Sequence, residues 1–227
     1  MAEIEAIAHI HTDFPSKFGI PRQSGLAEAL EGSIVFERKY RDVSALRGLE
    51  GYSHIWLIWG FSGAEMEGWS PTVKPPRLGG NRRMGVFATR SPFRPNRLGL
   101  SCVRLTGIET GTPRGPVLHV AGADLMDGTP IYDIKPYLPY VDCRSDATGG
   151  FTDDIDYQLL AVDFPDALLE MIPPEKREAL IEVLAQDPRP GYRHGEDGRR
   201  YGVSFAGFDV RFAVEGDALR VVEVVRL

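Results

Sequence analysis

Cysteine is scarce in this chain of 227 residues, which contains only Cys102 and Cys143. Two cysteines cannot build a disulfide framework or a zinc site by themselves. Each is interpreted either as a small buried apolar residue or as an unreactive surface thiol. Because disulfide frameworks are typical of oxidising compartments, their lack favours the cytoplasm as the place where the protein acts.

Long hydrophobic runs are also lacking. The sequence has no stretch of about 18 consecutive apolar residues, which is the length that a membrane-spanning helix requires. Its first residues, Met-Ala-Glu-Ile-Glu, place acids where a secretory signal carries basic residues ahead of an apolar stretch. We therefore expect a cytoplasmic protein that has no membrane partner.

The motifs that mark the commonest cofactor sites are missing too. There is no GxxxxGK[ST] loop, no HExxH, no pair of CxxC motifs, no GxSxG, and no GxGxxG opening a helix after a first strand. A Rossmann-type scaffold for a dinucleotide or a methyl donor is thereby disfavoured. The histidines are scattered, and no third ligand accompanies His9 and His11, so we expect no metal site.

Acidic side chains are missing from the middle of the chain. The net charge is −6, yet residues 68–108 contain no Asp or Glu and carry +8, which leaves −14 (−6 minus +8) for the remainder. Such separation of charge is typical of a protein that binds a polyanion, although these side chains could instead pair with acids elsewhere in the fold. Arginine predominates among them, and its planar guanidinium pairs with phosphate and stacks on bases. The basic residues are Lys74, Arg77, Arg82, Arg83, Arg90, Arg94, Arg97 and Arg104.

Many short strand-like segments, separated by glycine and proline, predict a mainly β fold that forms a barrel or a sandwich. Residues 52–61 are almost continuously apolar, which predicts a central strand buried on both faces. Pro136 and Pro139 confine the strand at 131–137 to an edge or an end of its sheet. The other predicted strands of this part of the chain are residues 4–11, 33–38, 84–89, 98–108 and 117–121, with a long loop at 69–83.

A composition change suggests a domain boundary. Residues 145–154 are small, polar and glycine-containing, as in a linker. We predict a β-barrel domain at residues 1–146 and a small α+β domain at 155–227. The second domain is predicted to contain a strand at 157–162, helices at 165–172 and 174–185, a charged loop at 187–201, and a hairpin of strands 203–214 and 218–225. An apolar face of the second helix comprises Ala179, Leu180, Val183 and Leu184.

The segment Gly85 to Leu100, GVFATRSPFRPNRLGL, is the most informative in the sequence. It predicts a strand leading into a loop that Pro92 and Pro95 stiffen, because proline fixes φ and reduces the entropy of the unfolded chain. Three arginines follow each other at near-regular intervals on this loop. We call residues 90–97 the arginine loop and expect it to bind phosphate or adenosine.

This segment resembles the signature of the TsaA-like family, also named YaeB or TrmO. Six further blocks match the family in the correct order, so that the resemblance covers essentially the whole chain. It implies a methyltransferase that uses S-adenosylmethionine to methylate N6 of threonylcarbamoyladenosine, next to the anticodon of tRNA (position 37). It also implies a non-Rossmann antiparallel β-barrel and a homodimer. The further blocks are PRQxG at 21–25, RGLE at 47–50, SHxW at 53–56, PPRLGG at 75–80, DLxDGTP at 124–130 with DIKPY at 133–137, and DPRPxY at 187–192.

The resemblance also implies roles for particular residues. Where the family often has histidine after the central strand, this chain has Ser62, which puts that contact in doubt. For Gly25, Gly128 and Asp127 the alternative is plain turn chemistry. The residues expected to bind S-adenosylmethionine are Gln23, Ser24, Gly25, Phe61, Ser62, Arg90, Leu100, Asp124, Leu125, Met126 and Asp127.

Methyl transfer needs positioning and a base of modest strength. Asp127 is the candidate base because it lies in the expected donor turn, and Asp133 is the reserve. Arg90 is expected to face the methyl donor and Arg94 and Arg97 the anticodon stem-loop of tRNA. The residues expected to bind RNA are Arg83, Arg94 and Arg97 in the barrel, and Arg189, Tyr192, Arg193, Arg199 and Arg200 in the second domain. That domain could alternatively support the barrel or a dimer.

Two other functions remain open from the sequence. A non-catalytic RNA-binding module would bind tRNA in a salt-sensitive way and have no affinity for a methyl donor. A methyltransferase for another small molecule would bind the donor without depending on tRNA.

Overall fold

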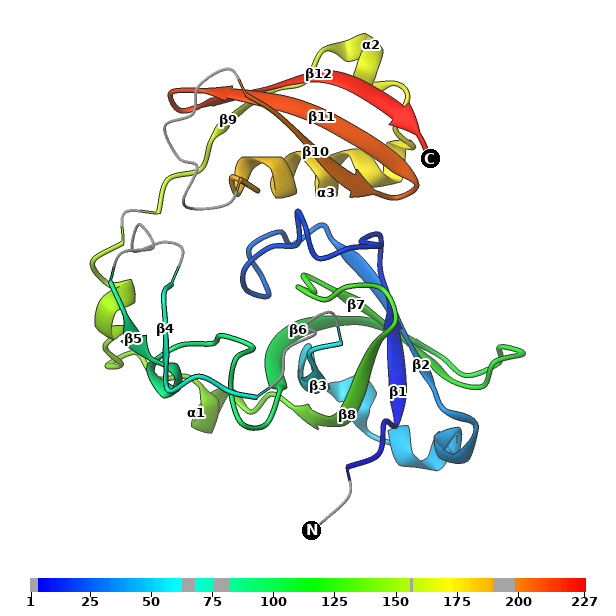
Figure 1. Ribbon diagram of the computed structural model, residues 1–227. Helices are drawn as coiled ribbons and strands as arrows, with labels where there is room; N and C mark the ends of the chain where they lie inside the picture. The colour runs from blue at the N-terminus through cyan, green and yellow to red at the C-terminus, as the bar shows by residue number, and fades with distance from the viewer. Residues whose placement is uncertain (1–3, 63–67, 76–81, 156, 190–198) are drawn as a thin grey trace.

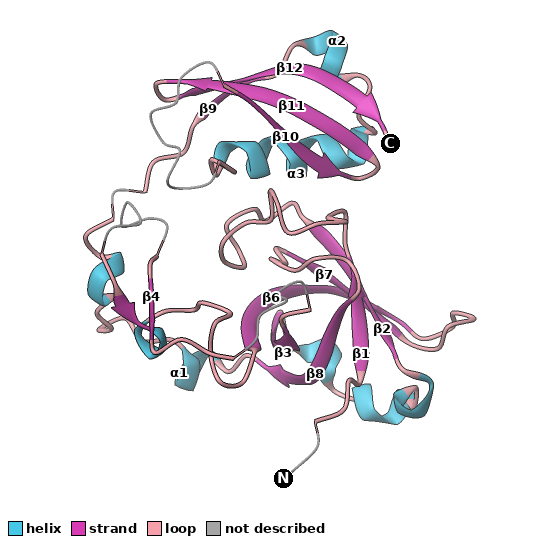
Figure 2. Ribbon diagram, viewed as in Figure 1, coloured by secondary structure: helices cyan, strands magenta, loops and turns pink. Residues whose placement is uncertain are grey.

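The computed structural model describes residues 4–62, 68–75, 82–155, 157–189 and 199–227 (Figures 1 and 2). Strands predominate in both halves of the molecule. A closed barrel occupies one half, and a four-stranded sheet with a helix against it occupies the other. The predicted mainly β fold with an antiparallel barrel is therefore confirmed. No helix in the described ranges has the length and apolar character needed to cross a membrane.

The barrel closes six antiparallel strands in the order β1-β2-β7-β6-β3-β8. Closure pairs every strand on both sides and so leaves no edge open for aggregation. Alternate side chains point inward and fill the interior, among them Ile10, Ile34, Leu57, Leu118 and Ile131, all fully buried. The strands are β1 (Ala8–His11), β2 (Glu31–Phe36), β3 (His54–Gly60), β6 (Leu98–Glu109), β7 (Val117–Ala121) and β8 (Thr129–Pro136).

Strand β3 is buried on one face only, so the prediction of burial on both faces is wrong. Ile55, Leu57 and Trp59 are buried, whereas His54, Trp56 and Ile58 between them are partly exposed. In a barrel the outer face of a strand has no second layer to cover it. Trp56 instead packs on Tyr137, with ring centroids 5.8 Å apart.

Strand β8 is not an edge strand, because it pairs with both β1 and β3. The expectation of an edge position is wrong, and the expectation of an end position is correct. Pro136 is the last residue of β8, so its missing N–H group does not interrupt the hydrogen bonds between the strands.

The segment before the arginine loop is less regular than predicted. Strands β4 (Thr72–Val73) and β5 (Met84–Gly85) form a short hairpin. The expected strand at 84–89 ends at Gly85, because the chain then turns into a 3-10 helix, Val86–Ala88. Among the described residues, the other short helices of this half are the 3-10 helices Arg38–Tyr40, Val43–Leu46 and Leu49–Gly51, and α1 (Pro139–Asp142); a 3-10 turn, Gly150–Thr152, follows.

The second half is a sheet of order β10-β11-β12-β9 with α3 packed against it. The predicted apolar face of α3 is buried, as expected. The expected strand at 203–214 is two strands, joined by a tight turn in which Ala206 and Gly207 both have positive φ. The turn was not predicted from the sequence, because asparagine or glycine usually occupies the position that Ala206 has here. The elements are β9 (Ala161–Asp163), α2 (Asp166–Leu169), α3 (Pro174–Ala185), β10 (Arg200–Phe205), β11 (Phe208–Glu215) and β12 (Ala218–Arg226).

The two halves share side chains. Phe14, Ala27 and Leu30 belong to the segment between β1 and β2, yet they are buried in the core of the second half. Figure 1 shows this segment between the barrel and α3. Polar contacts add to the junction, including an ion pair of 2.8 Å between Lys176 Nζ and Asp13 Oδ2. The division at residues 146 and 155 stays a prediction.

Candidate active site

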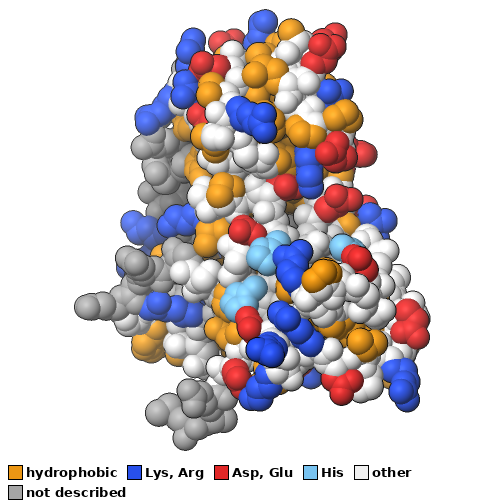
Figure 3. Space-filling model, turned by 90° about the vertical axis from the view of Figure 1, so that its right-hand side faces the viewer, with side chains coloured by type: hydrophobic (Ala, Val, Ile, Leu, Met, Phe, Trp, Pro, Cys, Tyr) orange, Lys and Arg blue, Asp and Glu red, His pale blue; other side chains and the backbone are white. Residues whose placement is uncertain are grey.

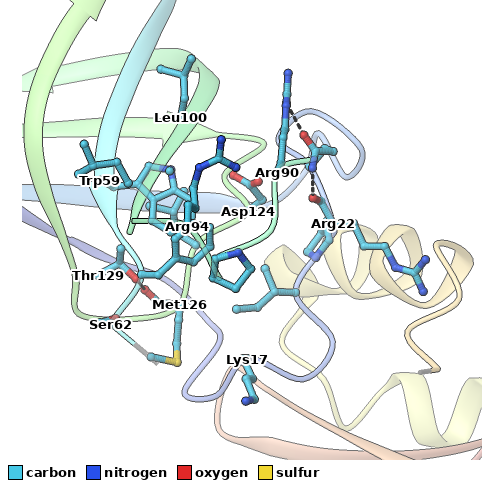
Figure 4. Close-up of a pocket in the computed structure, with 18 of the residues that line it drawn as sticks. Lys17, Arg22, Trp59, Ser62, Arg90, Arg94, Leu100, Asp124, Met126 and Thr129 are labelled. Atoms are coloured by element: carbon cyan, nitrogen blue, oxygen red, sulfur yellow. Dashed lines mark hydrogen bonds between the residues drawn. The ribbon is translucent and has the colours of Figure 1, made fainter. Parts of the chain in front are cut away.

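A cavity of about 660 Å³ opens at one end of the barrel, beneath the arginine loop (Figure 4). Its volume lies in the range of cavities that enclose small ligands. Four separate segments converge on it: the β1–β2 connection, the end of β3, the arginine loop with the start of β6, and the turn before β8. The lining residues are Lys17, Ile20, Pro21, Arg22, Gln23, Trp59, Phe61, Ser62, Thr89, Arg90, Pro92, Phe93, Arg94, Leu98, Gly99, Leu100, Asp124, Leu125, Met126 and Thr129.

An aromatic wall closes the inner side of the cavity. Trp59 and Phe61, on the same side of the chain at the end of β3, meet edge to face with ring centroids 4.4 Å apart. Gly99 lies opposite Trp59 in the neighbouring strand β6. A Cβ atom at Gly99 would lie 2.2 Å from the indole ring, so only glycine fits this position. The glycine that ends the signature is thus required by packing against Trp59.

A chain of hydrogen bonds leads from this wall to a carboxylate. The indole Nε1 of Trp59 donates to Ser101 Oγ at 2.9 Å, and Ser101 Oγ donates to Asp124 Oδ1 at 2.6 Å. Ser101 Oγ has one proton, which it donates to Asp124. The same Oγ accepts the hydrogen bond from Trp59 through a lone pair. Asp124 is the only carboxylate among the described residues that line the cavity.

Two opposing influences set the proton affinity of Asp124. Burial raises the pKa of the Asp124 carboxyl, since an ionised group is poorly solvated there. The hydrogen bond from Ser101 and the positive charge of Arg90 oppose this rise, and the net direction of the pKa is upward. A carboxylate of raised pKa in a ligand-sized cavity is typical of a functional group.

Arg90 lies at the rim of the same cavity (Figure 4). Its Nη1 donates to the side-chain oxygen of Gln23, so a neutral amide holds the guanidinium. Within the described part of the chain, no ion pair joins Arg90 to Asp124. Each charged group is therefore held by an uncharged partner and keeps its charge available for a ligand.

Arg94 also lines the cavity, which differs from the expected division of labour. Its Nη1 donates to the carbonyl oxygens of Thr89 at 2.8 Å and Ser91 at 3.4 Å. The side chain thus braces the arginine loop from within. Arg97 is half-buried, and its carbonyl oxygen accepts a hydrogen bond from the backbone N–H of Phe61 at 3.0 Å. Contact of Arg94 and Arg97 with tRNA stays a prediction.

Most of the residues expected to bind the donor surround the cavity, but Ser24 and Gly25 do not line it. Ser24 Oγ accepts a hydrogen bond from the backbone N–H of Cys102 at 3.2 Å. Gly25 has φ +78° and donates to the carbonyl oxygen of Gly122 at 2.9 Å. Both residues fasten the β1–β2 segment to the barrel. The expected residues that line the cavity are Gln23, Phe61, Ser62, Arg90, Leu100, Asp124, Leu125 and Met126.

Asp127, the expected base, lies outside the cavity lining. Its Oδ1 accepts a hydrogen bond from the backbone N–H of Thr12 at 3.1 Å and lies 3.2 Å from His11 Nδ1. These contacts tie the turn before β8 to the end of β1. The reserve, Asp133, is also outside the lining and pairs with Lys135 at 2.9 Å. The geometry therefore favours Asp124 over both.

Several lining residues were missed by reasoning from the sequence. Trp59 could have been found, because it lies two residues before Phe61 and side chains two apart share a strand face. Lys17 and Arg22 belong to an irregular segment in which no periodicity indicates direction. Their place in the wall depends on how that segment folds over the barrel.

The arginines expected to bind RNA in the second half differ in exposure. Arg189 is 5% exposed and forms a bidentate ion pair with Asp187, at 2.8 and 2.9 Å. Its predicted contact with RNA stays a prediction, and the structure shows the side chain paired within the fold. Tyr192 and Arg193 lie outside the described residues. Arg83 in the barrel, and Arg199 and Arg200 in the second half, are exposed.

Comparisons with known proteins agree with this architecture. The model of the tRNA-methyltransferase O N-terminal domain matches residues 9–143, and that of the TrmO C-terminal domain matches residues 157–227. The chain is 42% identical to the tRNA (adenine(37)-N6)-methyltransferase of Escherichia coli K12, over 93% of each chain. It is equally identical to a putative S-adenosylmethionine-dependent methyltransferase of Pseudomonas aeruginosa, over 97% of this chain and 96% of the other.

A solved structure gives the same result. The crystal structure of TrmO from Pseudomonas aeruginosa superposes with a TM-score of 0.79 at 36% identity, and the match covers 99% of both chains. The resemblance found in the sequence is thereby confirmed. The chain belongs to the TrmO family.

Proposed function

We propose that this protein transfers a methyl group from S-adenosylmethionine to N6 of threonylcarbamoyladenosine at position 37 of tRNA. The observation that carries the proposal is the cavity, where Arg90, the Asp124 carboxylate and an aromatic wall meet in a chain of the TrmO family. We further propose that it acts in the cytoplasm as a homodimer.

The residues of the cavity fit the methyl donor chemically. When bound, S-adenosylmethionine supplies an electrophilic methyl group on a positively charged sulfur. Arg90 can pair with the donor's carboxylate, and the amide of Gln23 holds that guanidinium in place. Phe61, Leu125 and Met126 provide an apolar wall for a purine ring. The negative charge of Asp124 favours a cationic ligand in the same space.

The chemical step requires a proton to leave N6 of the substrate. That nitrogen lies between a purine and a carbamoyl carbonyl, so its proton is more acidic than that of an ordinary exocyclic amine. A base of modest strength suffices. We assign this role to Asp124, whose raised pKa makes it a stronger base than an ordinary carboxylate. Ser101 holds Oδ1 of Asp124 and so orients the carboxylate.

Positioning supplies most of the remaining rate enhancement. Holding two reactants in line can contribute about 7–11 kcal/mol, provided that the site is rigid. Trp59, packed against Gly99 and bonded to Ser101, gives the cavity such a fixed wall. The proline-stiffened arginine loop gives it a second one.

One experiment tests the proposed reaction. Purified protein is incubated with a labelled methyl donor and with tRNA from cells that do or do not make threonylcarbamoyladenosine. We expect label only in the tRNA that carries the modification. Equal labelling of both pools would overturn the proposed substrate. Labelling of neither pool, with retained tRNA binding, would support a non-catalytic binding module instead.

A further inference from the structure

Two exposed aromatic side chains form a continuous apolar surface beside the cavity. Trp69 precedes strand β4 and is 51% exposed, and Phe87, in the 3-10 helix after β5, is 73% exposed. Their rings are stacked, with centroids 6.3 Å apart and an angle of 22° between the planes. Single apolar residues on a surface are common, whereas a joined aromatic pair marks a contact site.

Backbone hydrogen bonds fix this pair relative to the cavity. The N–H of Ser70, next to Trp69, donates to the carbonyl oxygen of Phe93 at 3.2 Å. The N–H of Val86, next to Phe87, donates to the carbonyl oxygen of Pro71 at 3.0 Å. Phe93 belongs to the arginine loop and lines the cavity. The backbone beside both rings is therefore tied, through Ser70 and Pro71, to the loop that lines the cavity.

The stretch of chain that carries the pair is rich in positive charge. Trp69 and Phe87 lie within residues 68–108, which contain no acid, and Arg82, Arg83 and Arg90 on the same stretch are exposed. The face of the molecule in Figure 3, turned away from the β4–β5 hairpin, intermixes acidic and basic side chains. A partner of this surface must offer negative charge together with flat apolar faces. Unpaired nucleotides combine both, and stacking on aromatic side chains is how proteins bind them.

We propose that Trp69 and Phe87 stack on an unpaired base of the RNA substrate that flanks the reacting adenosine. This inference rests on the proposed function, because it assigns a neighbouring nucleotide to the surface beside the cavity. The pair positions the RNA and takes no part in the transfer of the methyl group.

Variants of the aromatic pair test the inference. Trp69→Leu and Phe87→Leu keep apolar bulk and remove the flat ring. Stacking of one base contributes about 1–3 kcal/mol, so each variant should weaken binding of an anticodon stem-loop RNA about tenfold. The rate at saturating RNA and the Kd for the methyl donor should stay at the wild-type values. Tyr52→Leu, which removes an exposed ring just before the start of β3, is the matched control and should bind RNA normally.

Salt dependence separates stacking from charge. A phosphate contact contributes about 0.7 to the slope of log K against log salt for a single strand, whereas stacking releases no counterions. Trp69→Leu and Phe87→Leu should therefore lower the affinity by the same factor at every salt concentration. Arg83→Gln should reduce the slope. Trp69→Phe and Phe87→Tyr keep a ring and should restore affinity, which excludes a general effect of substitution on folding.

Three outcomes would overturn the inference. The first is that the leucine variants bind the RNA as tightly as the wild type. The second is that Trp69→Phe and Phe87→Tyr bind the RNA as weakly as the leucine variants. A change in oligomeric mass by sedimentation would assign the aromatic pair to contact with a second copy of the chain. Because RNA binding is measured without turnover, failure of methyl transfer by the wild type would overturn the proposed function separately.

Discussion

Two proline-flanked arginine segments of this molecule look alike in sequence and differ in structure. In the segment DPRP, Arg189 is buried and forms a bidentate ion pair with Asp187, two residues away. In the arginine loop, Arg90 is exposed, and a neutral amide, that of Gln23, accepts its hydrogen bond. Its acidic counterpart in the cavity, Asp124, accepts from Ser101 instead.

The difference shows what a local acid does to an arginine. Arg189 has Asp187 two residues away, and the ion pair between them contributes to the folded structure. Residues 68–108, which include Arg90, contain no acid. Arg90 and Asp124 form no ion pair with each other in the described part of the chain, so each can interact with a ligand. A buried ion pair is costly to break, whereas the open arrangement leaves two opposite charges in the cavity that we propose binds the methyl donor.

The largest expected effect concerns the acidic member of the open arrangement. Asp124→Asn removes the proposed base and should lower kcat by about 10²–10⁴-fold, the usual contribution of general-base catalysis. Asp127→Asn, outside the cavity, should keep near wild-type turnover. Single-turnover methylation assays measure both. A fully active Asp124→Asn enzyme would contradict the assignment, and an inactive Asp127→Asn enzyme with normal donor affinity would return the role to Asp127.

The closed pair should matter for stability instead. Arg189→Gln removes the buried guanidinium from its bidentate pair with the partly buried Asp187, and it should lower the free energy of unfolding by about 3–5 kcal/mol. Urea denaturation measures this change. Arg226→Gln, at an exposed position of β12, is the control and should shift stability by less than about 0.5 kcal/mol. Equal stability of the two variants would remove the contrast between the segments.

The next largest effect is expected for Arg90, the basic residue of the open arrangement. Arg90→Gln removes a charged hydrogen-bond donor and should raise the Kd of the methyl donor about tenfold or more. The positive charge of Arg90 lowers the pKa of Asp124, so its removal lets that pKa rise. Since the base must be ionised, the acidic limb of the rate profile should move to higher pH. Calorimetry and pH–rate profiles test the two effects independently.

The smallest effect is expected at the hydroxyl between Trp59 and Asp124. Ser101→Ala removes the hydrogen bond that opposes the upward shift in the pKa of Asp124. The acidic limb should therefore move to higher pH, with little change in the rate on the alkaline plateau. Ser204→Ala, in β10 of the second half, is a matched control and should leave the profile unchanged. A downward shift of the limb would contradict the proposed role of Ser101.

Reasoning from the sequence succeeded where a local rule and the global fold agree. The apolar run at residues 117–121 and the apolar face of α3 were both predicted correctly, because burial requires apolar side chains in each. The signature segment predicted an arginine at the site, since proline and glycine fix local geometry. Eight of the eleven expected donor contacts line the cavity.

Reasoning failed where long-range contacts decide. Whether Arg94 points outward or braces its own loop depends on carbonyl groups that the loop itself presents, as at Thr89. Whether the base is Asp124 or Asp127 depends on the direction of a turn in which both lie. Ala206 adopts a positive φ that its residue type disfavours, so the strand appeared continuous.

The sharing of Phe14 and Ala27 with the second core governs how a ligand reaches the cavity. These residues flank the segment that supplies Lys17, Arg22 and Gln23 to the wall, and both are almost completely buried. Lifting that segment would open a hydrophobic core, so the amide proton of Gly25, which is bonded to the carbonyl oxygen of Gly122, should exchange slowly. We therefore expect ligands to enter from the side where Leu100 is 52% exposed, while the β1–β2 wall stays in place.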